Sequence, residues 1–195
     1  MRSRSHVAWL AAVLVAALSL SMYAQDQSTG EATTASSDST LNRSVLVPLK
    51  TVKQLFPDIT HIDASGANFS AAGTPVATRV AIYATRDGSR KVTLSVDEYQ
   101  NAGDALSAYQ VAFKKSQSPE FAPIAISNVG ENVFAGTVTQ GSDTHVTIGA
   151  LDGILIVGAT MSGFDATTEN IASLSDLARK EVEEANTHVK ARRRR

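Results

Sequence analysis

The sequence predicts an α+β fold in which an antiparallel sheet of five or six strands packs with two main helices. Three observations predict it. Short stretches of alternating apolar residues are separated by turn residues, as in antiparallel hairpins. Two longer stretches, 101–116 and 165–189, have apolar residues at helical spacing. The order is short helix, hairpin, helix, meander and C-terminal helix, which fits helices packed against one antiparallel sheet.

The first elements are a short helix and a hairpin. Pro48 opens the helix and Pro57 ends it, and the residues 58–74 that follow are interpreted as a loop with one short strand. In the hairpin, a three-residue loop at 86–88 pairs Ile82 with Val92, whereas a two-residue turn would place Ile82 opposite Thr93. We predict the three-residue loop because it pairs apolar with apolar residues, Val80 with Leu94 included. Gly88 is then expected in the left-handed conformation.

The second half of the chain begins with a helix that has Asn101 as its N-cap and ends before Pro119. Four short strands are predicted next, with two-residue turns at 141–142 and 152–153. A helix of roughly 20 residues from Asp165 closes the domain. The four strands are 124–127, 133–139, 144–151 and 154–161.

The last three strands are predicted to have one apolar and one mixed face. The two tight turns place Val138, His145 and Thr160 in one row of the mixed face, and Phe134, Gly149 and Ile156 in another. One interpretation is structural: the Phe134 ring covers Gly149, and His145 is partly exposed. The other is a shallow groove that binds a ligand or partner. Its residues are His145, Phe134, Ile156 and Val138. The opposite, core face carries Val133, Ala135, Val146, Ile148, Ala150, Leu155, Val157 and Ala159.

The N-terminal part predicts export. Residues 1–24 have the charged end, the apolar run and the short residues of a secretory signal peptide. Residues 25–43, rich in Ser, Thr, Ala, Asp and Gln, are predicted to be a disordered linker. The single domain spans 44–189, and 190–195 form a basic tail. An extracytoplasmic location follows, either periplasmic or secreted, with tethering by an uncleaved N-terminal segment as the alternative.

Composition excludes several classes of chemistry. The chain has no cysteine, so thiolate catalysis and cysteine-ligated metals are excluded. No standard catalytic string is present, and we predict no catalytic residue, no cofactor and no metal. His61 and Asp63 point the same way on an extended segment, but two ligands do not make a structural zinc site.

Charge is unevenly distributed along the chain. Residues 25–189 have 11 basic and 19 acidic residues, whereas the tail carries five cations, which favour weak contact with an anionic membrane. The acidic body and the 6% content of aromatic residues argue against nucleic acid as a partner. The cations of the tail are Lys190, Arg192, Arg193, Arg194 and Arg195.

The order of elements over Val45–Ala185 resembles that of PsbP-like domains, which are secreted or lumenal α/β sandwiches. The resemblance implies an extracytoplasmic accessory or binding domain, commonly without catalytic activity. The arginine-rich end departs from that group.

The sequence therefore predicts an exported, non-catalytic domain that binds a partner protein or an envelope component. Two alternatives stay open. One is a hydrolase that uses His145 or His61 with a nearby carboxylate, and the other is a carrier of a small ligand on the mixed face.

Overall fold

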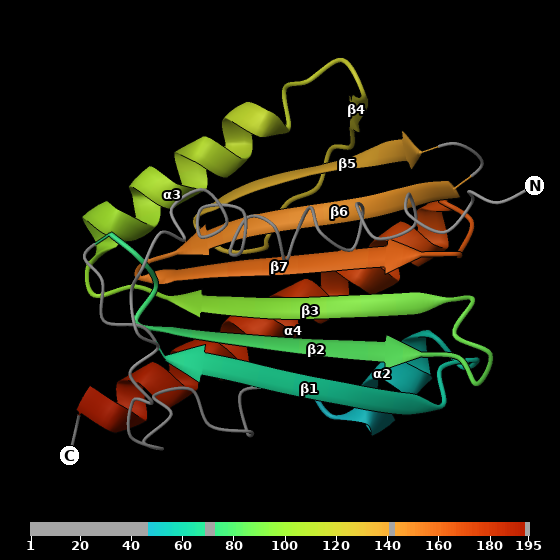
Figure 1. The fold of residues 1–195 in the computed structure, drawn as a ribbon, viewed down its shortest axis with the longest axis horizontal. Helices are drawn as coiled ribbons and strands as arrows, with labels where there is room; N and C mark the ends of the chain where they lie inside the picture. The colour runs from blue at the N-terminus through green and yellow to red at the C-terminus, as the bar shows by residue number, and fades with distance from the viewer. Residues whose placement is uncertain (1–46, 69–72, 141–142, 194–195) are drawn as a thin grey trace, which may run out of the picture.

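One antiparallel sheet of seven strands forms the centre of the molecule (Figure 1). The computed structural model describes residues 47–68, 73–140 and 143–193. The strand order is β1-β2-β3-β7-β6-β5-β4, so β7 lies between β3 and β6. The fold is α+β as predicted, with more strands than the five or six expected. The strands are β1 (His61–Asn68), β2 (Ala77–Ala84), β3 (Lys91–Glu98), β4 (Phe121–Pro123), β5 (Asn132–Gln140), β6 (Asp143–Asp152) and β7 (Leu155–Ser162).

Helices cover both faces of this sheet. The long helix α4 (Thr168–Arg193) packs on one face, against β7, β6 and β3, and the short helix α2 (Leu49–Leu55) contacts α4. Helix α3 (Ala102–Lys115) packs on the opposite face, against β6 and β7 (Figure 1). We call the two faces the α4 side and the α3 side. The main core lies on the α4 side, and a smaller second core lies under α3.

The ends of the first two helices follow from local chemistry. Pro48 directly precedes α2, as its fixed φ allows, and α2 ends just before Pro57. The Asn101 side chain accepts a hydrogen bond from the Asp104 amide at 2.9 Å and caps α3 as predicted. Lys114 and Lys115 in the last turn complement the helix dipole.

The predicted register of the first hairpin is wrong by one position. Ile82 lies opposite Thr93 and Val80 opposite Ser95, which is the pairing that the sequence argument rejected. A shift of one residue moves every side chain of a strand to the other face. Tyr83 of β2 therefore lies in the main core with Ala77 and Ala81, whereas Ile82 is 38% exposed on the α3 side.

The loop of that hairpin explains the error. It spans residues 85–90, and the Thr85 amide closes it by donating to the Arg90 carbonyl at 3.1 Å. Gly88 adopts the left-handed conformation expected for it, with φ of 70°. The loop is thus longer than the three residues predicted, and this length sets the register.

The final meander keeps its predicted faces. β5 and β6 pair as expected, with Val138 opposite His145 and Phe134 opposite Gly149. β6 and β7 are shifted by two positions, so His145 lies opposite Ser162 instead of Thr160. The turn consists of Gly153 and Ile154, and Gly153 has φ of 60°. Because the shift is even, the predicted core residues of all three strands belong to the main core or pack against it.

Two further expectations need correction. The segment 58–74 contains a full edge strand, β1, of eight residues. The strand expected at 124–127 is replaced by β4, which is three residues long and ends at Pro123.

No helix within the described residues is long and apolar enough to cross a membrane. The predicted signal peptide (1–24), the predicted linker (25–43) and the first three residues of the predicted domain (44–46) lie outside the described residues.

Candidate functional site

The mixed face of the meander is largely covered by α3. Phe134 is the centre of an aromatic cluster, with ring centroids 5.7 Å from Tyr109, 6.2 Å from Phe113 and 6.2 Å from Phe121. Phe134 and Val138 are each 8% exposed. Ile156 packs against the same second core. Three of the four residues predicted to bind a ligand or partner are therefore part of the packing between α3 and the sheet.

Two strand glycines make room for this cluster. A Cβ on Gly149 would lie 2.3 Å from Cζ of Phe134, and a Cβ on Gly136 would lie 2.2 Å from Cε1 of Phe121. The rings thus occupy the space above the glycines, as predicted for Phe134 and Gly149. The cavity beside Phe134 and Ile156 has a volume of about 20 Å³. This volume holds about one water molecule and no organic ligand.

The rest of the α3 side is polar across the central strands. Two neighbouring rows cross β3, β7 and β6 on this face. We call them together the polar strip. The outer row is at least partly accessible, whereas the side chains of the inner row are less than a tenth exposed. The outer row is Lys91, Ser162 and His145, and the inner row is Thr93, Thr160 and Thr147.

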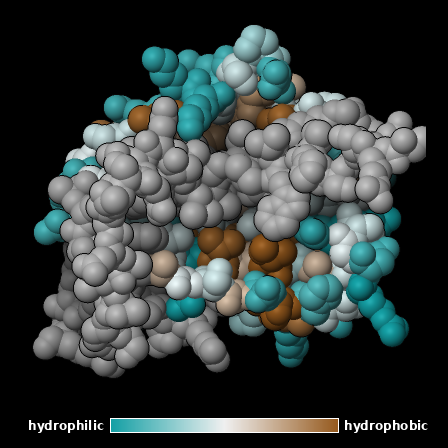
Figure 2. All heavy atoms as spheres, in the orientation of Figure 1, coloured by the Kyte–Doolittle hydropathy of each residue, from teal (hydrophilic) through white to brown (hydrophobic). Residues whose placement is uncertain are grey.

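The inner row consists of threonine hydroxyl groups at buried positions on the central strands, which are usually occupied by apolar side chains. The hydroxyls of Thr147 and Thr160 are 3.4 Å apart, within hydrogen-bond distance across β6 and β7. Ser95 of β3 continues the hydroxyl surface toward α3 and is 5% exposed. Central strands covered by a helix normally present branched apolar side chains. Figure 2 views the molecule from this side, and its uncovered central part shows hydrophobic atoms beside hydrophilic ones.

His145 is the residue of the strip with an unexplained polar atom. Its Nδ1 is buried and has no hydrogen-bond partner within the described part of the chain. Burial lowers the pKa of the imidazole, and the nearby charge of Asp143 opposes this effect. The ring is therefore mainly neutral at pH 7. A buried polar atom without a partner is uncommon, and a bound water or ligand is a usual explanation.

The same residues do not form a catalytic relay. In a serine hydrolase triad, a carboxylate accepts a hydrogen bond from the histidine Nδ1 and orients the ring toward the nucleophile. Here Ser162 lies opposite His145, and Asp143 precedes it by two residues on the same face. Because Nδ1 has no partner within the described residues, no described carboxylate orients the ring through this atom.

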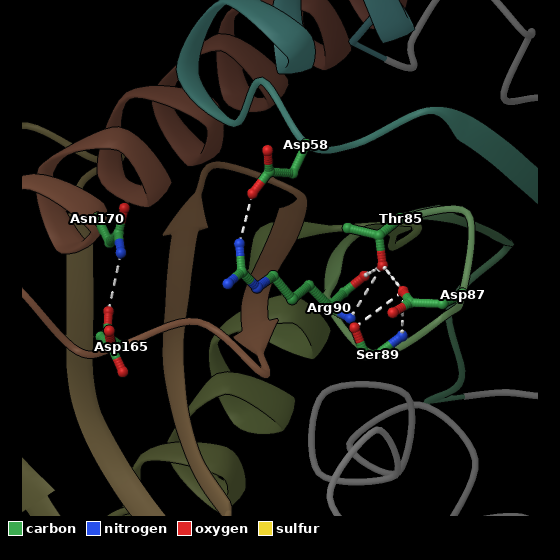
Figure 3. A network of polar contacts seen from close by, with 7 residues as sticks. All are labelled: Asp58, Thr85, Asp87, Ser89, Arg90, Asp165 and Asn170. Atoms are coloured by element: carbon green, nitrogen blue, oxygen red, sulfur yellow. Dashed lines mark hydrogen bonds and ion pairs between the residues drawn. The ribbon is translucent and has the colours of Figure 1, made fainter.

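A second polar region surrounds the hairpin loop between β2 and β3 (Figure 3). The Asp87 carboxylate accepts hydrogen bonds from the Thr85 hydroxyl at 2.6 Å and from the hydroxyl and amide of Ser89 at 2.8 and 3.1 Å. These bonds lower the pKa of Asp87 to about 2. Arg90 pairs with Asp58 and lies over the Phe164 ring. The contacts tie the loop to its neighbours, and the open hollow beside it, about 790 Å³, is lined by charges of both signs.

A further open groove of about 540 Å³ lies along α4 near its C-terminal end. Arg179 and Lys190 line it together with Glu131, Asp152 and Glu183. Asn186 donates a hydrogen bond to Asp152 across it. Acidic and basic groups are mixed, so the groove has no charge preference that would define a ligand.

The remaining predicted residues lie apart from the strip. His61 and Asp63 are exposed on β1 and share a face, as expected. No group of three or more metal-binding side chains occurs among the residues that the structure describes. Helix α4 continues to Arg193, so most of the predicted basic tail forms the end of this helix, and Arg194 and Arg195 lie outside the described residues.

Sequence reasoning identified His145 and missed the other members of the outer row. Lys91 and Ser162 join His145 only because β7 pairs with β3, which precedes it by more than 50 residues. A signal was nevertheless present. Thr93 and Ser95 alternate with Val92, Leu94 and Val96, so a polar face of β3 is visible in the sequence itself.

Comparison with known proteins gives a distant structural likeness and no family. No family model matches the chain, and no curated protein matches it. The extracellular domain of PknH from Mycobacterium tuberculosis is similar in structure, with a TM-score of 0.48 and 11% sequence identity. The match covers 73% of this chain and 93% of that chain.

Proposed function

We propose that this chain is an exported accessory domain, without catalytic activity, that binds a partner protein or envelope component through the polar strip. The observation that carries the proposal is the buried, unpartnered Nδ1 of His145 at the end of a row of polar side chains. Such a row on the central strands adds little to folding, so a role in recognition explains it better.

The strip suits a polar ligand surface. Ser162 and the neutral imidazole of His145 offer hydrogen bonds, and Lys91 adds one positive charge beside them. Hydroxyl groups and amides of a partner match these groups. An extracytoplasmic place of action rests on the signal peptide predicted at residues 1–24 and on the accessory role that the PsbP-like order of elements implies.

The experiment is capture from envelope extract at low and high salt. The wild-type chain is expected to retain a component that His145→Ala loses at both salt concentrations. Lys180→Ala serves as the matched control, because Lys180 is exposed on α4, on the opposite side of the sheet. Equal capture by wild type and His145→Ala, or no capture by wild type, would contradict the proposal.

The basic tail supplies a separate contact that salt distinguishes. Exposed charges are screened at distances beyond ~8 Å at physiological ionic strength. We propose weak binding of the tail to vesicles that contain anionic lipid, which disappears in high salt and in neutral vesicles. Replacing Lys190 and the following arginines by glutamine should remove this binding and leave capture through the strip intact.

A further inference from the structure

The first strand of the sheet has an edge without the usual protection. β1 is the outermost strand, and it is eight residues long (Figure 1). Side chains 61–67 are all exposed, and no described strand lies beyond them. β1 has no proline or lysine along its length. An edge of this kind is a template for pairing with another strand.

The opposite edge is protected. β4 is three residues long and ends in Pro123, which has no amide to donate. Short edge strands and proline are two of the devices that prevent strand pairing. The molecule therefore offers one open edge and one closed edge.

We propose that two copies of this chain pair antiparallel through β1, about a two-fold axis that lies midway between their two Ala64 residues. Two identical strands become antiparallel through an axis perpendicular to the sheet, and this axis keeps each face on its own side. Side chains directly opposite each other share a face. In such a pair, each residue therefore lies opposite a residue of the other copy whose number differs from its own by an even number. The residue at the axis lies opposite its own copy.

Among the registers with an even offset, the sizes and charges of the β1 side chains favour the one with the axis at Ala64. This register uses all seven exposed residues, and each large side chain meets a small one. Ile62 lies opposite Gly66, His61 opposite Ala67, and the Asp63 carboxylate opposite the Ser65 hydroxyl. An axis at Asp63 would instead place two carboxylates directly opposite each other, which is unfavourable.

The α4 side of this edge also fits the register. A Cβ on Gly66 would lie 2.8 Å from Nη1 of Arg79, so the guanidinium group lies directly over this glycine. Ile62 is 38% exposed in the single chain. In the pair, the Ile62 side chain of each copy packs on the flat guanidinium over Gly66 of the other copy.

The pairing has a consequence for the polar strip. Because the axis is perpendicular to the sheet, the α3 sides of both copies point the same way, and the two strips lie on one continuous surface. A partner with repeated binding groups then engages both copies, which raises its apparent affinity. This consequence depends on the proposed function, whereas the pairing itself does not.

The test is the oligomeric state of the full chain, in the form in which cells produce it. A single pair of strands buries less than a standard interface, so we expect a concentration-dependent monomer–dimer equilibrium in sedimentation velocity. Ala64→Lys places two cations opposite each other at the axis and should weaken dimerisation at least about tenfold. Ala122→Lys on the exposed part of β4 is the matched control and should dimerise like wild type.

Cysteine substitution tests the register, because the natural chain has no cysteine. Opposite residues in antiparallel strands have Cα atoms about 4.5 or 5.5 Å apart, within the range of a disulfide. Ala64→Cys should therefore form a disulfide-linked dimer under mild oxidation, faster than Ala122→Cys. If Ala64→Lys is monomeric and still captures an envelope component, binding through the polar strip does not require the pairing through β1, so the two proposals can fail independently.

Three results would overturn the self-pairing. These are a wild-type chain that stays monomeric at millimolar concentration, an Ala64→Lys variant that dimerises like wild type, and equal cross-linking of the two cysteine variants. A monomeric wild type that binds a foreign extended peptide at β1, with Ala64→Lys abolishing the binding, would assign the edge to another protein instead.

Discussion

The two faces of the sheet are built by different means. The α4 side is a continuous apolar layer in which Leu94, Ile148 and Leu174 are fully buried. The α3 side has a small aromatic cluster around Phe134 at one end and the polar strip on the central strands. The same strands β3, β6 and β7 supply both faces, so the difference comes from the alternation of residues along them.

Under the proposed function, this difference separates folding from recognition. Burial of apolar area supplies most of the stability of a domain, and most of that area lies on the α4 side. The hydroxyl groups of the α3 side add little to the stability. Burying a polar group costs free energy of desolvation, and its hydrogen bonds only offset that cost. The α4 side therefore supplies most of the stability, and under the proposed function the α3 side supplies the binding surface.

The largest effect is expected from Ile148→Ala on the α4 side. Ile148 is 0% exposed, and its truncation leaves a cavity in the main core. Such substitutions cost about 2–5 kcal/mol, and we expect about 4 kcal/mol in the free energy of unfolding from urea titration. A loss below about 1 kcal/mol would show that the α4 side is not the main source of stability.

A buried carboxyl group on the α4 side gives a pH-dependent prediction. Glu181 is fully buried on α4, and its Oε2 accepts a hydrogen bond from the Val47 amide at 3.1 Å. The Val47 carbonyl accepts a hydrogen bond from Tyr83 of β2, so two side chains fix this backbone. Burial raises the pKa of Glu181 to about 8, with a smaller contribution from Glu184.

The sign of the pH effect follows from this raised pKa. The folded state keeps the Glu181 proton from pH 4.5 up to about 8, whereas the unfolded state releases it near 4.5. The contribution of protonated Glu181 to the free energy of unfolding is therefore fully present below pH 4.5 and is lost as the pH rises to 8. Glu181→Gln mimics the protonated form and should be more stable than wild type at pH 9, by up to about 5 kcal/mol.

Urea titrations at pH 5, 7 and 9 test this prediction. The difference between Glu181→Gln and wild type should grow with pH, because only the wild type loses a proton from this site. Glu183→Gln is the control, since Glu183 is an exposed glutamate on the same helix. Parallel curves for Glu181→Gln and wild type would contradict a buried, protonated Glu181.

Phe134→Ala should affect the α3 side alone. Phe134 joins α3 to β4 and β5 through its contacts with Tyr109, Phe113 and Phe121. Removing the ring leaves α3 poorly packed while the main core stays intact, so we expect a local loss of about 2 kcal/mol. Hydrogen exchange should quicken in α3 and stay slow in β3 and β7. Uniformly faster exchange would show that the two cores unfold together.

The sequence predicted the faces of the meander better than its pairings. An error of two positions between β6 and β7 left every side chain on its predicted face, whereas an error of one position between β2 and β3 reversed Val80 and Ile82. The physical reason is the hairpin loop, whose length depends on side-chain bonds to Asp87 that alternation does not encode.

Other features were beyond sequence reasoning because they depend on long-range contacts. Apart from Ile62, β1 carries small and polar residues, which are exposed on both faces, so it has no alternation to reveal it. The outer row of the strip needs β7 to insert beside β3, and no local pattern specifies that pairing. By contrast, the Phe134 ring over Gly149 was predictable, since a large residue opposite a strand glycine fills the gap.

The smallest effect on stability is expected within the polar strip itself. Thr160→Val replaces a buried hydroxyl by a methyl group, which removes the 3.4 Å contact with Thr147 and adds apolar surface. These changes oppose each other, so we expect a change in the free energy of unfolding below about 1 kcal/mol. Capture of the envelope component should fall nonetheless, because the proposed site loses a polar group, and Thr160→Ser should retain it. A Thr160→Val variant that binds like wild type would confine recognition to the outer row, and one that unfolds would make the hydroxyls part of the fold.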